Sequence, residues 1–221
     1  MPLSVYIETT IVSYLTARPS RDLVIRAHQR LTREWWRDRR TDFALHISPL
    51  VLQEARMGDR RVARRRLRAL RGIPVLAVTP GAIALARRLV RRGPIPERAE
   101  VDALHIATAP VHGMDYLVTW NCRHIANAMM RNLIEALCRL GRYEPPITKG
   151  SGTYATIPPD PLVRVEGSHA CTRAGKCGAL PAGPTRRGGP PPLPNPPRRL
   201  CGLVRTVAQI SDRTVCAHPK S

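Results

Sequence analysis

The sequence predicts an α/β fold, a three-layer α/β/α sandwich with a mostly parallel central sheet. Short apolar segments recur along the first 148 residues, and longer segments with helical periodicity separate them. Strands that alternate with helices are joined by right-handed crossovers, which produce a parallel sheet with helices on both faces. The short strand segments are apolar at nearly every position, as burial on both faces requires.

Each predicted element follows from a local pattern. Thr9 or Thr10 is expected to cap the first helix, and Ser48-Pro49 carries the signal of a capped helix with proline at its first position. The predicted strands cover residues 4–7, 43–47, 73–78 and 115–119. The predicted helices cover residues 9–17, 21–40, 49–57, 60–70, 80–92, 96–113 and 122–140.

The composition changes near residue 148, which divides the chain into a folded domain at 1–148 and a tail at 149–221. Twelve of the 22 prolines follow Gly150, so we expect the tail to be disordered and dispensable for folding of the domain. The simplest origin is a reading-frame shift near Thr148 in a GC-rich gene. The alternatives are a genuine basic RNA-binding arm and a polyproline segment that a partner binds.

The chain carries a net charge of +20, and almost all of its positive charge comes from arginine. Excess positive charge attracts phosphate backbones, although a GC-rich genome also favours arginine codons. The run RRVARRRLRALR at 60–71 is accordingly either an RNA track or a solvated helix face. No long apolar run and no signal-peptide layout is present, so we expect a cytoplasmic protein that does not enter the membrane. The six cysteines match no zinc spacing and are expected to be reduced thiols.

Ligands of such sheets bind at the carboxyl ends of the strands, where Glu8 follows the first strand and Asn121 follows the last. Glu54 and Asp102 are acids in apolar surroundings. Carboxylates that converge there would repel one another unless a divalent cation neutralised them, and oxygen ligands suit Mg²⁺ or Mn²⁺. The alternatives are that Glu8 merely favours a helix N-terminus and that the other two acids pair with surface arginines.

Other candidates near these positions have both a structural and a functional interpretation. His105 is more often a packing or hydrogen-bonding residue than a ligand at such a position. Arg123 and His124, expected at the start of the last helix, either contact phosphate or are exposed capping residues. The Trp35-Trp36 pair is expected in the core or at a dimer contact rather than stacked on a base.

Taken together, these motifs resemble the PIN-domain family, in particular its VapC-like toxins, over residues 3–147. The resemblance rests on an acid followed by a hydroxyl residue after the first strand, a mid-chain glutamate, an aspartate that opens a helix, and a Thr-x-Asp/Asn element after the last strand. The segments are VYIETTIVSYL (5–15), ISPLVLQEA (47–55), DALHIATAPVHGMDYLVTWNCRHIANA (102–128) and GRYEPPIT (141–148).

The resemblance implies that the metal-binding and catalytic residues are Glu8, Glu54 and Asp102, with Asn121 where many relatives have a fourth aspartate. Thr10 matches the family's hydroxyl residue. Glu8 replaces the more usual aspartate, and Asn121 offers an amide oxygen without charge. The sequence also departs after residue 148, where relatives continue into an edge strand, so we expect that strand to be lost.

The implied activity is Mg²⁺- or Mn²⁺-dependent hydrolysis of RNA phosphodiesters by the toxin of a toxin–antitoxin pair. The implied partners are RNA, a cognate antitoxin and a second copy of the chain. One alternative is a PIN-like protein that binds RNA without cleaving it. Another is a basic nucleic-acid-binding protein whose acids are surface groups.

Overall fold

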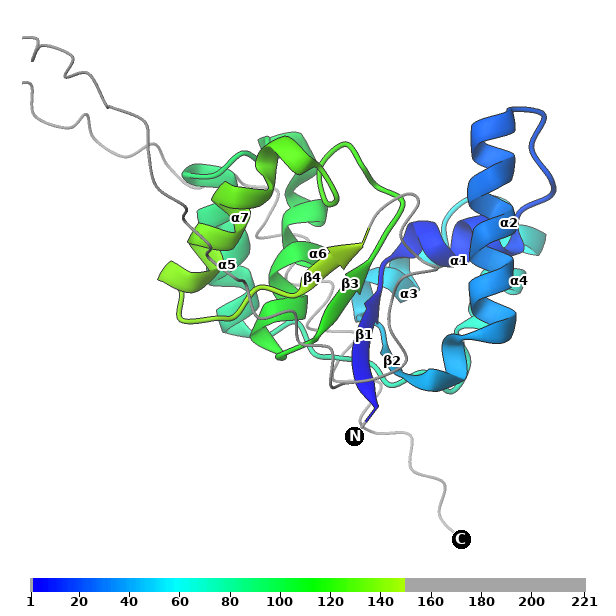
Figure 1. Ribbon diagram of the computed structural model, residues 1–221, viewed down its shortest axis with the longest axis horizontal. Helices are drawn as coiled ribbons and strands as arrows, with labels where there is room; N and C mark the ends of the chain where they lie inside the picture. The colour runs from blue at the N-terminus through cyan, green and yellow to red at the C-terminus, as the bar shows by residue number, and fades with distance from the viewer. Residues whose placement is uncertain (1, 150–221) are drawn as a thin grey trace, which may run out of the picture.

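A computed structural model describes residues 2–149 of the chain, and the predicted tail lies outside the described residues. The sheet has four strands in the order β2-β1-β3-β4, and every neighbouring pair is parallel (Figure 1). The strands are β1 (Leu3–Ile7), β2 (Phe43–His46), β3 (Tyr116–Val118) and β4 (Ile147–Lys149). This confirms the predicted α/β class with a parallel central sheet.

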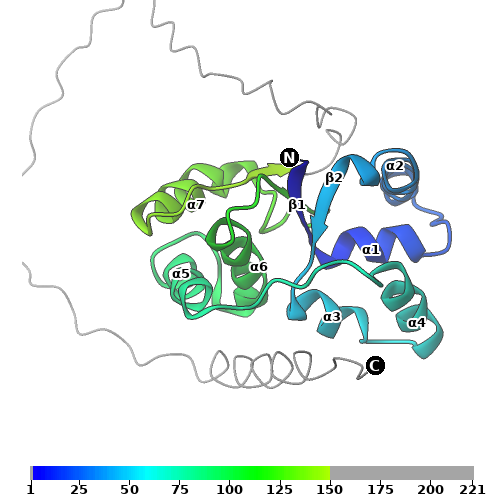
Figure 2. The ribbon, with the colours of Figure 1, turned by 90° about the horizontal axis from the view of Figure 1, so that it is seen from below.

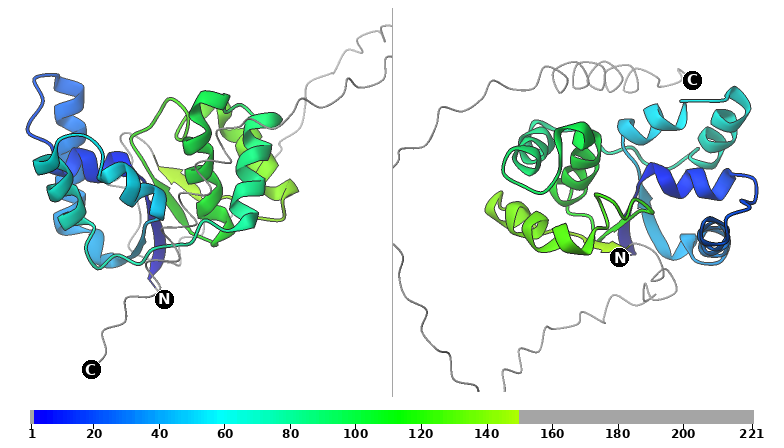
Figure 3. Two further views of the ribbon diagram at one scale, coloured as in Figure 1. Left: turned by 180° about the vertical axis from the view of Figure 1, so that it is seen from behind. Right: turned by 90° about the horizontal axis from the view of Figure 1, so that it is seen from above.

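The helices form two groups on either side of the central strands. Figure 2 shows α1 to α4 gathered on one side and α5 to α7 on the other, and the views in Figure 3 agree. They are α1 (Thr9–Thr16), α2 (Leu23–Asp38), α3 (Pro49–Ala55), α4 (Arg60–Ala69), α5 (Pro80–Arg91), α6 (Glu100–Val111) and α7 (Ala128–Leu140), with short 3-10 turns at Arg40–Asp42 and Glu97–Ala99. None of the helices between residues 2 and 149 is long and apolar enough to cross a membrane.

The predicted strand at 73–78 is wrong, and so is the expected loss of the final strand. The first segment makes only an isolated bridge, between Ile47 and Val75. Pro74 lacks a backbone N–H, and the segment is largely exposed or half-buried, so little draws it into the sheet. At the opposite edge of the sheet, the outer position next to β3 is taken by β4, whose Ile147 pairs with Tyr116. The three residues that follow Pro145 and Pro146 therefore form an edge strand.

Two helix starts also differ from the prediction. Glu8, not a threonine, caps α1, because its carboxylate accepts a hydrogen bond from the Thr10 N–H. The last helix begins at Ala128 rather than at Cys122, since the Asn127 side chain accepts a hydrogen bond from the Met129 N–H and starts the helix there. Residues 122–126 form a turn before it.

The core is centred on β1, whose Val5, Tyr6 and Ile7 are fully buried. Residues at the carboxyl end of this strand therefore enter a dry part of the molecule. Trp35 is also buried, and its ring stacks on Phe43 with the centroids 6.0 Å apart. The expectation that this tryptophan packs in the core is confirmed.

Close packing around Gly93, just after α5, yields a test of the fold. A Cβ atom there would overlap the Leu89 carbonyl oxygen and lie 2.9 Å from Leu137 Cδ1 on α7. We expect Gly93→Ala to lower the free energy of unfolding by about 1–3 kcal/mol, the usual result of overpacking. Urea denaturation followed by circular dichroism measures this. Arg92→Ala, at the exposed neighbouring position, should change stability by less than about 0.5 kcal/mol, and equal stability of the wild type and Gly93→Ala would contradict the packing argument.

Candidate active site

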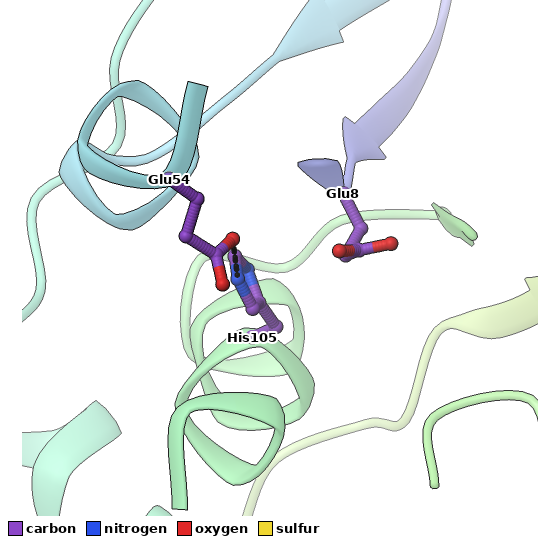
Figure 4. Close-up of side chains that lie close together, drawn as sticks. All are labelled: Glu8, Glu54 and His105. Atoms are coloured by element: carbon purple, nitrogen blue, oxygen red, sulfur yellow. Dashed lines mark hydrogen bonds and ion pairs between the residues drawn. The ribbon is translucent and has the colours of Figure 1, made fainter. Parts of the chain in front are cut away.

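Three polar side chains from different elements meet where the central strand ends. Glu8 follows β1 directly, Glu54 lies on α3 and His105 on α6, and Figure 4 shows all three turned toward one another. One potential ligand atom from each lies within 4.8 Å of the others. The cluster lies at the carboxyl end of β1, where the crevice rule for parallel sheets places ligands.

Glu8 is held by hydroxyl groups rather than by a cation. Its Oε2 accepts hydrogen bonds from Thr10 Oγ1 at 2.5 Å, from Thr119 Oγ1 at 2.7 Å and from the Thr10 N–H at 3.1 Å. Thr10 Oγ1 in turn accepts from the Trp120 N–H at 2.8 Å. Thr10 thus ties the carboxylate to the segment that follows β3, which gives the predicted hydroxyl residue a positioning role.

Glu54 lies opposite Glu8 and is also hydrogen-bonded. Its Oε2 accepts from the Thr9 hydroxyl and from His105 Nε2, the latter at 3.1 Å. Burial alone would raise the pKa of the Glu54 carboxyl, but the hydrogen bonds from His105 and Thr9 and the charge of a protonated His105 lower it below its usual value. The carboxyl group is therefore ionised at neutral pH and available to a cation.

His105 belongs to a buried chain of hydrogen bonds that runs through the core. Ser48 Oγ lies 2.7 Å from Tyr6 Oη, which lies 2.8 Å from His105 Nδ1, and His105 Nε2 reaches Glu54. A carboxylate only accepts, so Nε2 carries the hydrogen toward Glu54, and in the neutral ring Nδ1 accepts from the Tyr6 hydroxyl. Burial opposes the charged ring, but hydrogen bonding and attraction to Glu54 together raise the pKa of His105. The expected hydrogen-bonding role of this histidine is confirmed.

Asp102 and Asn121 lie beside this cluster and are joined by His124. The Asp102 carboxylate is 2.7 Å from His124 Nδ1, and Asn121 Oδ1 accepts from the His124 N–H at 3.1 Å. Asp102 lies one helical turn before His105 on α6, and its charge contributes to the raised pKa of that histidine. The Asn121 N–H donates to Thr119 Oγ1 at 2.9 Å, so the same hydroxyl contacts both Asn121 and Glu8.

The structure therefore divides the predicted set into two linked parts. Glu8 and Glu54 share the compact cluster with His105, Asp102 is not part of it, and Asn121 is linked to Glu8 through Thr119 Oγ1. Arg123 is exposed in the turn and His124 binds Asp102, so neither lies at the start of a helix as expected. Four further residues belong to the site: Tyr6 had no predicted role, Thr9 and Ser48 were predicted only as helix caps, and Thr119 only as the first residue of the Thr-x-Asn element.

A divalent cation fits the charges of the compact cluster. Glu8 is only 4% exposed, and no lysine or arginine between residues 2 and 149 forms an ion pair with it. A protonated His105 balances one of the two carboxylates and leaves the other uncompensated, which is unfavourable in a buried place. A hard cation such as Mg²⁺ or Mn²⁺ would neutralise both through their oxygens. Because both ring nitrogens are hydrogen-bonded, His105 would remain the partner that orients Glu54.

The buried chain gives a stability test that does not involve metal. Tyr6→Phe removes the hydroxyl that satisfies both Ser48 and His105, so we expect the free energy of unfolding to fall by about 1–3 kcal/mol. Urea denaturation in EDTA measures the change. Thr108→Val is the control: it removes a fully buried hydroxyl from α6, but the Leu104 carbonyl keeps its helical partner. If the two variants lose equal stability, the chain contributes no more than an ordinary buried hydroxyl.

The comparisons with known proteins agree with this geometry. The family model described as PIN domain matches residues 5–126, which is more than half of the chain and includes every residue of the site. Comparison with curated proteins and with solved structures found no significant match. The order of the motifs, the parallel sheet and the buried acids at its carboxyl edge all accord with the family match, and the chain belongs to the PIN-domain family.

Proposed function

We propose that the protein is a Mg²⁺- or Mn²⁺-dependent endoribonuclease. The observation that carries the proposal is the pair of carboxylates, buried Glu8 and half-buried Glu54, at the carboxyl ends of the strands of a PIN domain. PIN domains are typically nucleases, which makes hydrolysis of a phosphodiester the reaction to test first. The cluster of Glu8, Glu54 and His105 supplies carboxylate oxygens as ligands, so metal-assisted attack by water fits the residues present.

Glu8 and Glu54 would hold the cation, and Asp102 would bind at the same centre from α6. A bound divalent cation supplies Lewis acidity, which polarises the phosphate and makes hydroxide available near neutral pH. The hydroxyls of Thr10 and Thr119 fix the Glu8 carboxylate, and Thr9 and His105 fix that of Glu54. The fold brings the two carboxylates close together. These hydrogen bonds then hold them in place before the cation binds.

A second candidate function is RNA binding without turnover. Asn121 stands where many relatives have an acid, and its Oδ1 already accepts a hydrogen bond from the His124 N–H. The position therefore adds no negative charge to the site, which disfavours a second cation. Metal-dependent cleavage of RNA separates the two candidates, because only the nuclease would produce new RNA ends.

The biological role that we propose is the toxin of a cytoplasmic toxin–antitoxin pair. The support is the resemblance of the motifs to VapC-like toxins. A protein of this kind would bind a cognate antitoxin and pair with a second copy of itself. The start of α2 offers apolar contact surface, since Leu23 is 77% and Val24 63% exposed, and such side chains often lie in protein interfaces.

The activity test uses the purified full-length protein and total cellular RNA. We expect cleavage in Mg²⁺ or Mn²⁺, no cleavage in excess EDTA, and a loss of at least about 100-fold in Asp102→Asn, since removing an acid that holds metal usually reduces activity by this amount or more. Circular dichroism should show that the variant remains folded. Cleavage that persists unchanged in EDTA would overturn the metal-dependent mechanism, and absence of cleavage under all conditions would favour the binding protein.

Metal binding provides a measurement that is independent of activity. Titration of Mn²⁺ by electron paramagnetic resonance should show a site in the wild type that weakens at least about 10-fold in Glu8→Gln, because the neutral amide removes half of the carboxylate charge of the pair. Glu144→Gln makes the same chemical change at a side chain that is 84% exposed and should bind Mn²⁺ like the wild type. Equal affinity in all three proteins would place the metal elsewhere.

A further inference from the structure

Between residues 2 and 149, the arginines of α4 form no ion pairs with acidic side chains. Five arginines elsewhere in this part of the chain do form them, and they are Arg30, Arg37, Arg39, Arg131 and Arg139. Six arginines of the run at 60–71 are exposed, namely Arg60, Arg61, Arg64, Arg65, Arg68 and Arg71. A solvated helix face in a basic protein would look similar, so the charge alone decides nothing.

The second observation is a hollow of about 770 Å³ between the end of α1 and the start of α4. Arg18 enters it from the segment after α1, and Arg61 and Arg65, one turn apart on α4, enter it from the other side. Asp59 also lines the hollow, but its Oδ1 accepts hydrogen bonds from the backbone N–H groups of residues 61 and 62 at 2.9 and 3.0 Å. Three arginines therefore face one carboxylate that is already engaged as a helix cap.

The position of the hollow relates it to the acidic site. Helix α1 begins at Thr9, directly after Glu8, and ends at Thr16, so it separates the carboxylates from Arg18 by about 12 Å at 1.5 Å per residue. Figures 2 and 3 show α4 lying next to α1. An RNA strand whose scissile phosphate lay at Glu8 would reach the hollow with a phosphate only a few nucleotides away. The arginines of α5 lie across the sheet, in the other helix group.

We propose that the hollow formed by Arg18, Arg61 and Arg65 binds a backbone phosphate of single-stranded RNA beside the cleavage site. This inference rests on the proposed ribonuclease function and extends it to the path of the substrate. Guanidinium groups bind phosphate oxygens in pairs of charge-assisted hydrogen bonds, and such contacts fix the register of the strand without reading its bases. A positive hollow near two buried carboxylates also offsets their repulsion of the RNA backbone.

The test compares two double variants of the full chain that remove the same charge. Arg61→Gln/Arg65→Gln changes the hollow, and Arg87→Gln/Arg91→Gln changes exposed arginines of α5. Binding of a 12-nucleotide single-stranded RNA is measured by fluorescence anisotropy in EDTA between about 50 and 200 mM salt. Every phosphate that the protein no longer neutralises should reduce the slope of log K against log salt by about 0.7, so we expect a reduction of about 0.7–1.4 in the hollow variant and none in the α5 variant.

Arg61→Lys/Arg65→Lys provides a rescue control, because it retains both charges and should retain most of the slope. Urea denaturation should show equal stability of all variants. Equal reductions in the hollow and α5 variants would overturn the proposal by showing that net charge alone determines binding, and unchanged slopes would overturn it as well. A poly-glutamate peptide added as competitor tests the other occupant: if the hollow variant loses affinity for that peptide alone, the hollow binds an acidic protein segment instead.

The proposal and the nuclease function can fail separately. RNA binding in EDTA requires neither metal nor turnover, so a reduced salt slope would be meaningful even if no cleavage were found. Mn²⁺ affinity should be equal in the hollow variant and the wild type, because none of the three arginines contacts Glu8 or Glu54. If the protein cleaves RNA but the salt slopes are unchanged, the ribonuclease proposal stands and the proposal that the hollow binds phosphate is wrong.

Discussion

The burial of the Glu8 carboxylate immediately after the central strand is the constraint that organises this molecule. A charged group that is 4% exposed loses most of its hydration, and that loss has to be replaced within the protein. The chain replaces it with hydroxyls from Thr10 and Thr119 and with the N-terminus of α1, where the carboxylate serves as the helix cap. One side chain thereby sets where α1 begins and how closely β3 lies beside β1.

Every polar atom of a buried site needs a hydrogen-bond partner, so the site involves residues other than the acids. The neighbouring carboxylate of Glu54 depends on His105, which depends on the Tyr6 hydroxyl, which is joined to Ser48. These residues come from α3, α6, β1 and the cap of α3, so the site and the core are one network. Partial satisfaction of such a network is worse than an apolar core, which explains why its polar atoms are paired so consistently.

The two kinds of charge in the domain act over different distances. The acids of the site, buried Glu8 and half-buried Glu54, are fixed by hydrogen bonds, so their attraction for a cation is strong and short-ranged. Most arginines of α4 are exposed and screened by salt, so they attract a polyanion as a group, and only Arg61 and Arg65 in the proposed hollow would place one of its phosphates. A chain with a net charge of +20 can therefore hold an acidic centre in its folded domain.

The sequence by itself determined the fold class and the neighbourhood of the site. Alternating periodicities predict a parallel sheet, Glu8 stands out as an acid at a strand end and Glu54 as an acid in an apolar run, because these signals are local along the chain. The starts of helices were harder to predict from the sequence. The last helix begins at Ala128 because Asn127 caps it, but the residues before it are also compatible with a helix and conceal that boundary.

Only the tertiary structure decided which partners each residue meets. The segment at 73–78 has strand composition, yet it makes only one bridge, beyond the end of β2, while β4 forms the opposite edge beside β3, since pairing depends on which backbone the chain brings alongside. Whether His105 packs against apolar groups or orients Glu54 depends on α3 lying opposite α6, and the placement of Asp102 beside His124 depends on a turn that the helical pattern hides. Periodicity and composition describe one segment at a time. A site of this kind is formed by side chains that are distant in sequence and that together replace the hydration lost by one buried charge.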